Sequence, residues 1–291
     1  MTVEPGTVDV HQHLLPAAFV EVLRRRNAPP RIIGAELETA EGRFAFDPAE
    51  HELESRLAAL DRQGTDVAVL SLQGTFGLEA LGPGERAELV AAWEDGIAEI
   101  VADARGRFVA LAAGPTRPGF VGSCVGSDVL NDPGALGVVV ESLRRHGGFV
   151  LVHPAGGPVP SNVPGWWGAI ALYTAQMQGA YLGWLAHGQE RWPDVAIVFS
   201  ILAGGGPFQL ERLGSRGIDV RSVLHRNVFF DTASYGRRAL ELCVETFGVE
   251  QIVYGSDVPV IDPEPTLRAV KGFGESVEKL IRCDNPNRLL A

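Results

Sequence analysis

Two histidines near the amino terminus are the first residues whose type and spacing could do chemistry. His11 and His13 stand at the end of a short apolar run that begins at Val8. Residues i and i+2 of a β-strand point to the same face, so two imidazoles would leave this strand side by side, as two ligands of one metal ion do. The motif is short, and two unrelated polar residues at a strand end would look the same. A metal site therefore needs partners elsewhere in the chain.

Two further potential ligands also close apolar runs. His153 ends the run 148–153, and Asp257 ends the run 251–257. Together with the two N-terminal histidines they would make a set of three imidazoles and one carboxylate, which suits Zn²⁺ or another divalent transition metal. Whether the four side chains meet depends on the fold.

Apolar runs alternate with helical patterns along the chain, which predicts a parallel sheet covered by helices. Eight such units favour an α/β fold of the closed (β/α)8, or TIM, barrel type, formed by residues 1–291 as one domain. An open doubly wound sheet would need a glycine-rich phosphate turn after an early strand, where this chain has histidines instead. The polar segment 14–46 is predicted to be a rim insertion. The expected strands are 8–13, 67–72, 108–112, 119–125, 148–153, 195–202, 227–231 and 251–257.

A barrel of this kind sorts the histidines by face. The carboxyl ends of all strands open onto one catalytic face, where His11, His13, His153 and Asp257 are expected to converge on one divalent ion. His146, His187 and His225 precede strands and belong to the opposite face. His51 follows Asp47 and Pro48, which are typical of a helix N-terminus, so it is expected in the first turn of a helix on the catalytic side.

Composition narrows the class of partner. The formal charge of −11 argues against nucleic acid or an anionic membrane surface as a main partner, which leaves a small-molecule substrate. The three cysteines form no CxxC and no paired framework, and no signal-peptide pattern precedes the first strand, so a cytoplasmic protein is expected. The charge-free segment 168–186 has a polar middle that would fit a bilayer poorly. We expect a helix there that is covered on several faces, in part by a second copy in a homodimer.

The motifs together resemble the amidohydrolase superfamily, and more narrowly its amidohydrolase-2 branch, which contains aminocarboxymuconate semialdehyde decarboxylase and related hydrolases and decarboxylases. The resemblance rests on the H-x-H at 11–13, the V-H-P at 152–154, the G-S-D-x-P at 255–259 and the closing N-P-N-R-L-L at 285–290. It implies a (β/α)8 barrel and one metal ion, usually zinc, bound by His11, His13, His153 and Asp257. The lysine-bridged two-metal variant is disfavoured, because the lysines of this chain are Lys271 and Lys279, near its end.

One departure from the family pattern affects the chemistry. Relatives usually carry a histidine at the end of strand six, in an H-G-G-G-like turn, and it helps to activate a metal-bound water. Here the stretch reads Leu-Ala-Gly-Gly-Gly-Pro over 202–207, which puts Ala203 in the place of the histidine. Three explanations stay open: Asp257 serves as the base, another group such as His51 replaces the lost ring, or the barrel binds a ligand without turning it over.

The predicted function is that of a metal-dependent hydrolase or carboxy-lyase. Hydrolysis of an amide, ester or lactone and loss of CO2 from an unsaturated or aromatic acid both fit, with Asp257 moving the proton, and a metal-free lactonase-like mode is a further alternative. Arg43 and Arg117 could clamp a carboxylate, although a solvated position is the favoured interpretation of both. By their positions after strands, the candidates for substrate binding are Gln73, Phe76, Asn162, Trp166, Trp167 and Tyr235.

Overall fold

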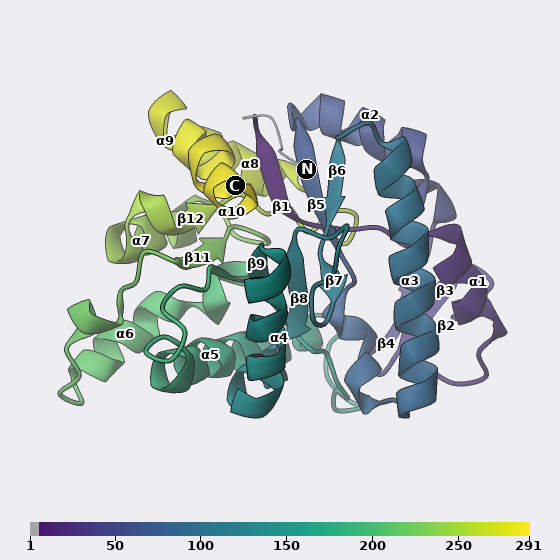
Figure 1. The fold of residues 1–291 in the computed structure, drawn as a ribbon, viewed down its shortest axis with the longest axis horizontal. Coiled ribbons are helices and arrows are strands. Elements are labelled where there is room, and N and C mark those ends of the chain that lie inside the picture. Colours follow the sequence, from purple (N-terminus) through teal and green to yellow (C-terminus); the bar gives the residue numbers. More distant parts are fainter. Residues whose placement is uncertain (1–5) are drawn as a thin grey trace.

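The computed structural model describes residues 6–291, and within them parallel strands run around a central barrel (Figure 1). Hydrogen bonding divides the strands into one sheet in the order β1-β5-β6 and one in the order β12-β11-β10-β9-β8-β7, and all neighbours are parallel. The strands are β1 (Val8–His13), β5 (Val67–Ser71), β6 (Phe108–Ala110), β7 (Ala112–Ala113), β8 (Gly122–Gly126), β9 (Phe149–His153), β10 (Ile197–Phe199), β11 (Val228–Asp231) and β12 (Ile252–Val253).

Backbone hydrogen bonds join the two sheets at both seams. At one seam β6 and β7 are a single strand interrupted at Leu111, whose N–H donates to the carbonyl of Leu70 at 2.9 Å. At the other, the N–H of Val10 donates to the carbonyl of Tyr254 at 2.9 Å, and the N–H of His13 donates to that of Val258 at 2.8 Å. The predicted TIM barrel is therefore confirmed, with β6 and β7 counted as one of eight strands.

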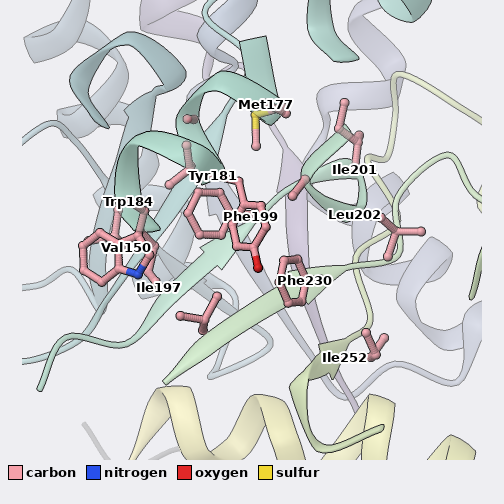
Figure 2. Close-up of a cluster of buried hydrophobic side chains, with 14 of the residues drawn as sticks. Val150, Met177, Tyr181, Trp184, Ile197, Phe199, Ile201, Leu202, Phe230 and Ile252 are labelled. Carbon is pink, nitrogen blue, oxygen red and sulfur yellow. The ribbon is translucent and has the colours of Figure 1, made fainter. Parts of the chain in front are cut away.

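Helices cover the outside of the barrel (Figure 1). Apolar side chains are buried on both faces of its strands. The barrel interior holds a compact set of branched and aromatic residues that includes Val10, Val69, Leu151 and Phe229. Figure 2 shows part of the outer layer, where Tyr181 meets the rings of Phe199 and Phe230 edge to face at 5.4 and 5.5 Å. The helices are α1 (Ala17–Arg25), α2 (Leu53–Gln63), α3 (Pro83–Asp103), α4 (Pro133–His146), α5 (Tyr173–Gly183), α6 (Gly206–Gly214), α7 (Arg237–Phe247), α8 (Glu264–Lys271), α9 (Glu275–Lys279) and α10 (Asn285–Leu290).

The segment between β1 and α2 is structured. It contains α1 and a three-stranded antiparallel sheet of β2 (Arg31–Ile33), β3 (Glu36–Thr39) and β4 (Gly42–Ala45). This sheet borders the carboxyl ends of the barrel strands, where residues 37–42 and 44–47 line a cavity described below. The rim insertion predicted for residues 14–46 stays a prediction.

Several predicted helix and strand boundaries were wrong. The last strand, expected over 251–257, is only β12 (Ile252–Val253). Asp47 caps a short 3-10 turn, Pro48–His51, and Glu52 is extended, so α2 begins only at Leu53. His51 thus stands in a turn at the catalytic face and outside α2. Strand six ends at Phe199, earlier than predicted, because the chain then enters a left-handed turn in which the φ of every residue from Ile201 to Gly205 is positive. A left-handed conformation costs a non-glycine residue about 1–2 kcal/mol, so the surrounding contacts must hold this turn.

The charge-free segment packs as part of the core. It forms one continuous helical stretch over residues 168–188, and its Met177, Tyr181 and Trp184 side chains are buried against the barrel. None of the helices in residues 6–291 is long and apolar enough to cross a membrane. The homodimer expected from this segment stays a prediction.

A buried arginine supports the strand that carries the two N-terminal histidines. The Arg56 guanidinium is 2% exposed and donates to the carbonyl of His13 at 2.7 Å, to the Gln12 side chain and to the carbonyl of Val258. Gln12 in turn donates to the buried carboxylate of Asp9 at 2.8 Å. Arg56 therefore ties β1 to the end of the last barrel strand.

Replacing this arginine should destabilise the whole barrel. In Arg56→Ala the acceptors on β1 and beside β12 lose their donor while they stay buried, which should lower the free energy of unfolding by about 3 kcal/mol. Urea denaturation followed by circular dichroism measures this change. Arg24→Ala is the matched control, because Arg24 is exposed and forms a surface ion pair with Glu21, and it should change the value by less than about 0.5 kcal/mol. A similar small change for both variants would contradict the role given to Arg56.

Candidate metal centre and cavity

Three histidines and one aspartate meet at the carboxyl end of the barrel. His11 and His13 end β1, His153 ends β9 and Asp257 follows β12. The Nε2 atoms of His11 and His13 lie 3.1 Å apart, and Oδ1 of Asp257 lies 3.2 Å from Nε2 of His13. One potential ligand atom from each of the four residues lies within 4.8 Å of all the others. The structure thus brings together the four side chains that the sequence predicted as metal ligands.

Hydrogen bonds of the three Nδ1 atoms determine the orientation of the three imidazole rings. Nδ1 of His11 lies 2.7 Å from the Asp231 carboxylate, Nδ1 of His13 lies 2.9 Å from the carbonyl of Ser71, and Nδ1 of His153 lies 2.9 Å from the carbonyl of Pro154. Each partner accepts hydrogen bonds only, so each Nδ1 is the donor. In a neutral ring the lone pair is then on Nε2, and all three lone pairs point to one place. This is the arrangement that metal-binding histidines use.

The Asp257 carboxylate is also suited to bind a metal ion. Oδ1 of Asp257 is buried and has no hydrogen-bond donor within the described residues. Burial raises the pKa of the Asp257 carboxyl, but the histidines outweigh burial and leave it lowered, so the group is ionised at neutral pH. An unpaired carboxylate oxygen beside three nitrogen lone pairs is a donor set that a divalent transition metal would satisfy.

Asp231 supports the centre from behind. Its Oδ2 holds His11, while its Oδ1 accepts the N–H of Ile201 at 2.9 Å and that of Ala233 at 3.0 Å. The same carboxylate therefore orients one ligand and anchors the left-handed turn after β10. In the sequence this residue is the last of the expected strand 227–231, and it was not among the predicted site residues.

A cavity of about 870 Å3 opens over the four residues. Its walls are mostly apolar and come from the ends of the strands, the antiparallel sheet and residues 154–174. Carboxylates of Glu38, Glu41, Asp47, Glu50 and Asp257 line it, and no lysine or arginine of the described chain does. Arg43 pairs instead with Glu36 and Glu38, and Arg117 pairs with Glu94, which confirms the solvated interpretation of both arginines.

Half of the predicted substrate-binding residues face this cavity. Gln73, Phe76 and Tyr235 line it, as does His51. Among the residues that the structure describes, Asn162, Trp166 and Trp167 are not part of the lining, and the two indoles are 57% and 37% exposed. Other residues of the loop after β9 line the cavity instead, namely Ser161, Val163, Pro164 and Gly165. The cavity lining therefore gives no support to substrate binding by Asn162, Trp166 or Trp167.

The residue at the end of strand six that faces the centre is Ile201. It lines the cavity, whereas Ala203 is fully buried in the core between the barrel and its helices. The chain leaves strand geometry here, because residues 201–205 form a left-handed turn, so the alternation of side chains along a strand does not extend to them. The position open to a strand-six histidine is therefore Ile201, and the prediction that Ala203 marks this position was wrong.

Sequence and structure comparisons agree with this geometry. The family model described as Amidohydrolase matches residues 8–291. This chain belongs to the amidohydrolase family. It is therefore an enzyme of a family whose members include decarboxylases, as the relatives below illustrate.

The named relatives are remote in sequence. A 2-amino-3-carboxymuconate-6-semialdehyde decarboxylase from Dictyostelium discoideum is 23% identical over 77% of this chain and 72% of its own length. Among solved structures, the Metarhizium anisopliae IDCase has a TM-score of 0.79 at 19% identity, with coverage of 99% and 98% of the two chains. The 5-carboxyvanillate decarboxylase from Sphingomonas paucimobilis has a TM-score of 0.77 at 19% identity, with 99% of each chain covered. A dihydroxybenzoic acid decarboxylase from Polaromonas, solved with bound manganese, has a TM-score of 0.76 at 16% identity and coverage of 99% and 97%. At these identities the structures support the fold.

Removing the support behind His11 should weaken metal binding. Asp231→Asn replaces the carboxylate that holds His11 Nδ1 with an amide, and loss of such a partner typically lowers metal affinity about 10–100-fold. Competition with a chromogenic chelator measures the dissociation constant for Zn²⁺. Asp194→Asn is the control, since Asp194 pairs with Arg144 at the surface and its variant should bind the ion normally. Unchanged affinity in Asp231→Asn would contradict the role assigned to this carboxylate.

Metal affinity should also rise with pH. Burial disfavours the charged His11 ring, but Asp231 and Asp257 outweigh burial and raise the pKa of His11 to about 9. Below that pH the ring therefore carries a second proton, on Nε2. Burial and the neighbouring histidines lower the pKa of His153 to about 3, so this ring is neutral throughout. A bound cation must displace the His11 proton, and the apparent affinity should increase about tenfold per pH unit between pH 6 and 8. Isothermal titration calorimetry in two buffers counts the protons released, and a count near zero at pH 7 would contradict the expectation.

Proposed function

We propose that the protein is a metal-dependent carboxy-lyase that removes CO2 from a small aromatic or unsaturated acid with a single carboxylate. His11, His13, His153 and Asp257 would hold one divalent transition ion, of which Zn²⁺ is our first choice and Mn²⁺, which a relative's structure contains, our second. When bound, this ion supplies a fixed positive charge that binds the substrate carboxylate. The names of several relatives, which are decarboxylases of aromatic or unsaturated acids, support the choice of reaction.

The observation that carries the proposal is the charge of the cavity. Among the described residues, its lining contains five carboxylates and no lysine or arginine. An acid that enters can therefore place one carboxylate at the four-residue centre. A second carboxylate would meet further carboxylates at the wall, where Arg31 and Arg43, two arginines beside the lining, are already paired with Glu38. The carboxylate is thus directed to the reacting end, and the rest of the molecule lies against apolar walls.

The side chains around the centre suit loss of CO2. Apolar surroundings, including Ile201, withdraw water from the carboxylate and favour its conversion to neutral CO2. Cleavage of the carbon–carbon bond leaves its electron pair on the substrate carbon, which then takes a proton. Asp257 is the carboxylate of the centre itself, and it is positioned to accept a proton from water and deliver it to this carbon.

Hydrolysis of a neutral ester, lactone or amide is the second candidate, and one observation favours it. Oδ1 of Asp257 is ionised and unpaired, as a base that takes a proton from an attacking water must be. Ile201 weighs against this candidate, because its apolar side chain stands where a second polar group would assist the tetrahedral intermediate.

A substrate panel separates these possibilities. Metal-loaded enzyme should release CO2 from a monocarboxylate such as 2,6-dihydroxybenzoate at least about tenfold faster than from 5-carboxyvanillate, because the second carboxylate of the latter meets further carboxylates at the wall. Release is followed by a coupled bicarbonate assay, and a chelator should abolish it. Turnover of phenyl acetate or a lactone without CO2 release would favour hydrolysis instead. Activity that survives complete removal of the metal would contradict the metal-dependent mechanism.

A further inference from the structure

His51 is a further histidine at the wall of the cavity, separate from the four-residue centre. It ends the 3-10 turn Pro48–His51, and its Nδ1 lies 3.2 Å from the backbone N–H of Leu15. Its ring stacks on Phe46 with centroids 5.4 Å apart and an interplanar angle of 19°. Two independent contacts therefore hold the imidazole in one orientation at the cavity wall.

These contacts determine which nitrogen carries the proton. A backbone N–H can only donate, so Nδ1 of His51 must present its lone pair to Leu15, and the proton of the neutral ring is on Nε2. Among the described residues none accepts a hydrogen bond from this Nε2, and it is not one of the buried polar atoms that lack a partner. Since the residue lines the cavity, its N–H is available to a molecule bound there.

The charged groups around the ring keep it neutral. Burial, the nearby Arg56 guanidinium and His13 lower the pKa of His51 to about 4, and Asp47 opposes them only in part. The ring is therefore a neutral donor over the whole range in which the protein would work. Such a group adds a hydrogen bond to the cavity without adding a cation that would attract a second carboxylate.

We propose that His51 is a substrate-binding residue that donates its Nε2–H to an oxygen of the substrate, such as a hydroxyl or carbonyl, that is distinct from the reacting carboxylate. This inference rests on the proposed function for the carboxylate at the metal centre. It assigns the substrate class more closely, as an acid with an uncharged oxygen substituent on an otherwise apolar body. Sequence reasoning left His51 as one of three open explanations for a missing base, and its fixed tautomer points to binding instead of proton transfer.

Binding of simple benzoates to the cobalt-substituted enzyme tests this. Dissociation constants for benzoate and for 2-, 3- and 4-hydroxybenzoate are measured from the visible cobalt spectrum. Wild type should bind at least one hydroxybenzoate about fivefold to tenfold more tightly than benzoate, the size of one neutral hydrogen bond. His51→Phe, which keeps a stacked ring, should remove this preference and leave the benzoate constant within about twofold. His51→Gln, whose amide can accept from Leu15 and donate to the ligand, should retain most of the preference.

The outcomes separate the inference from the function it rests on. If no benzoate changes the cobalt spectrum of wild type, the proposed carboxylate site fails and the inference fails with it. If benzoate binds but wild type shows no preference, or His51→Phe keeps it, only the role of His51 is overturned. Equal weakening of every benzoate in His51→Phe would show a structural role and would also overturn it.

A direct measurement avoids dependence on a folded variant. Nitrogen-15 spectra of histidine-labelled wild-type protein should show one neutral ring with its proton on Nε2, and this resonance should shift on addition of the preferred hydroxybenzoate but not of benzoate. A proton on Nδ1 of His51, or a charged ring at pH 7, would overturn the inference.

Discussion

Three hydrogen bonds made away from the cavity determine what this site can bind. They hold Nδ1 of His11 against Asp231, that of His13 against the carbonyl of Ser71 and that of His153 against the carbonyl of Pro154. Because each Nδ1 is committed as a donor, the three Nε2 atoms face each other beside the unpaired oxygen of Asp257, and they present three lone pairs once a metal ion displaces the proton of His11. The closed barrel makes this possible, because β1 and β9 end on the same face as the segment after β12 that carries Asp257. Backbone hydrogen bonds join β1 to this segment.

The lining of the cavity limits which molecules can bind beside the metal centre. A cavity lined by five carboxylates and no lysine or arginine among the described residues leaves the metal centre as its positive end. Recognition of the remainder must then come from apolar contact and neutral hydrogen bonds. Ile201 and His51 divide these tasks, because the first presents an apolar wall and the second a neutral N–H. The left-handed turn that aims Ile201 depends on Asp231, the residue that also orients His11, so metal binding and pocket shape share one carboxylate.

The sequence was sufficient for the architecture and for the four central side chains. Apolar runs that end in His13, His153 and Asp257 mark strands whose carboxyl ends must meet in a closed barrel. It was insufficient wherever the backbone leaves regular geometry. Nothing in a run of glycines shows that the turn after Phe199 is left-handed, so Ala203 was given the position that Ile201 occupies. Likewise the exposed tryptophans of the loop after β9 cannot be told from inward-facing ones by position alone, and the tautomer of His51 depends on a backbone N–H 36 residues away.

The central claim is that one metal ion occupies the point to which the three Nε2 atoms and Asp257 are directed. A crystal structure of the purified protein with anomalous data at the zinc and manganese edges tests it most directly. The account predicts one anomalous peak, at about 2.0–2.3 Å from Nε2 of His11, His13 and His153 and from a carboxylate oxygen of Asp257. A peak elsewhere, two peaks at the site, or none in protein supplied with both metals would contradict it.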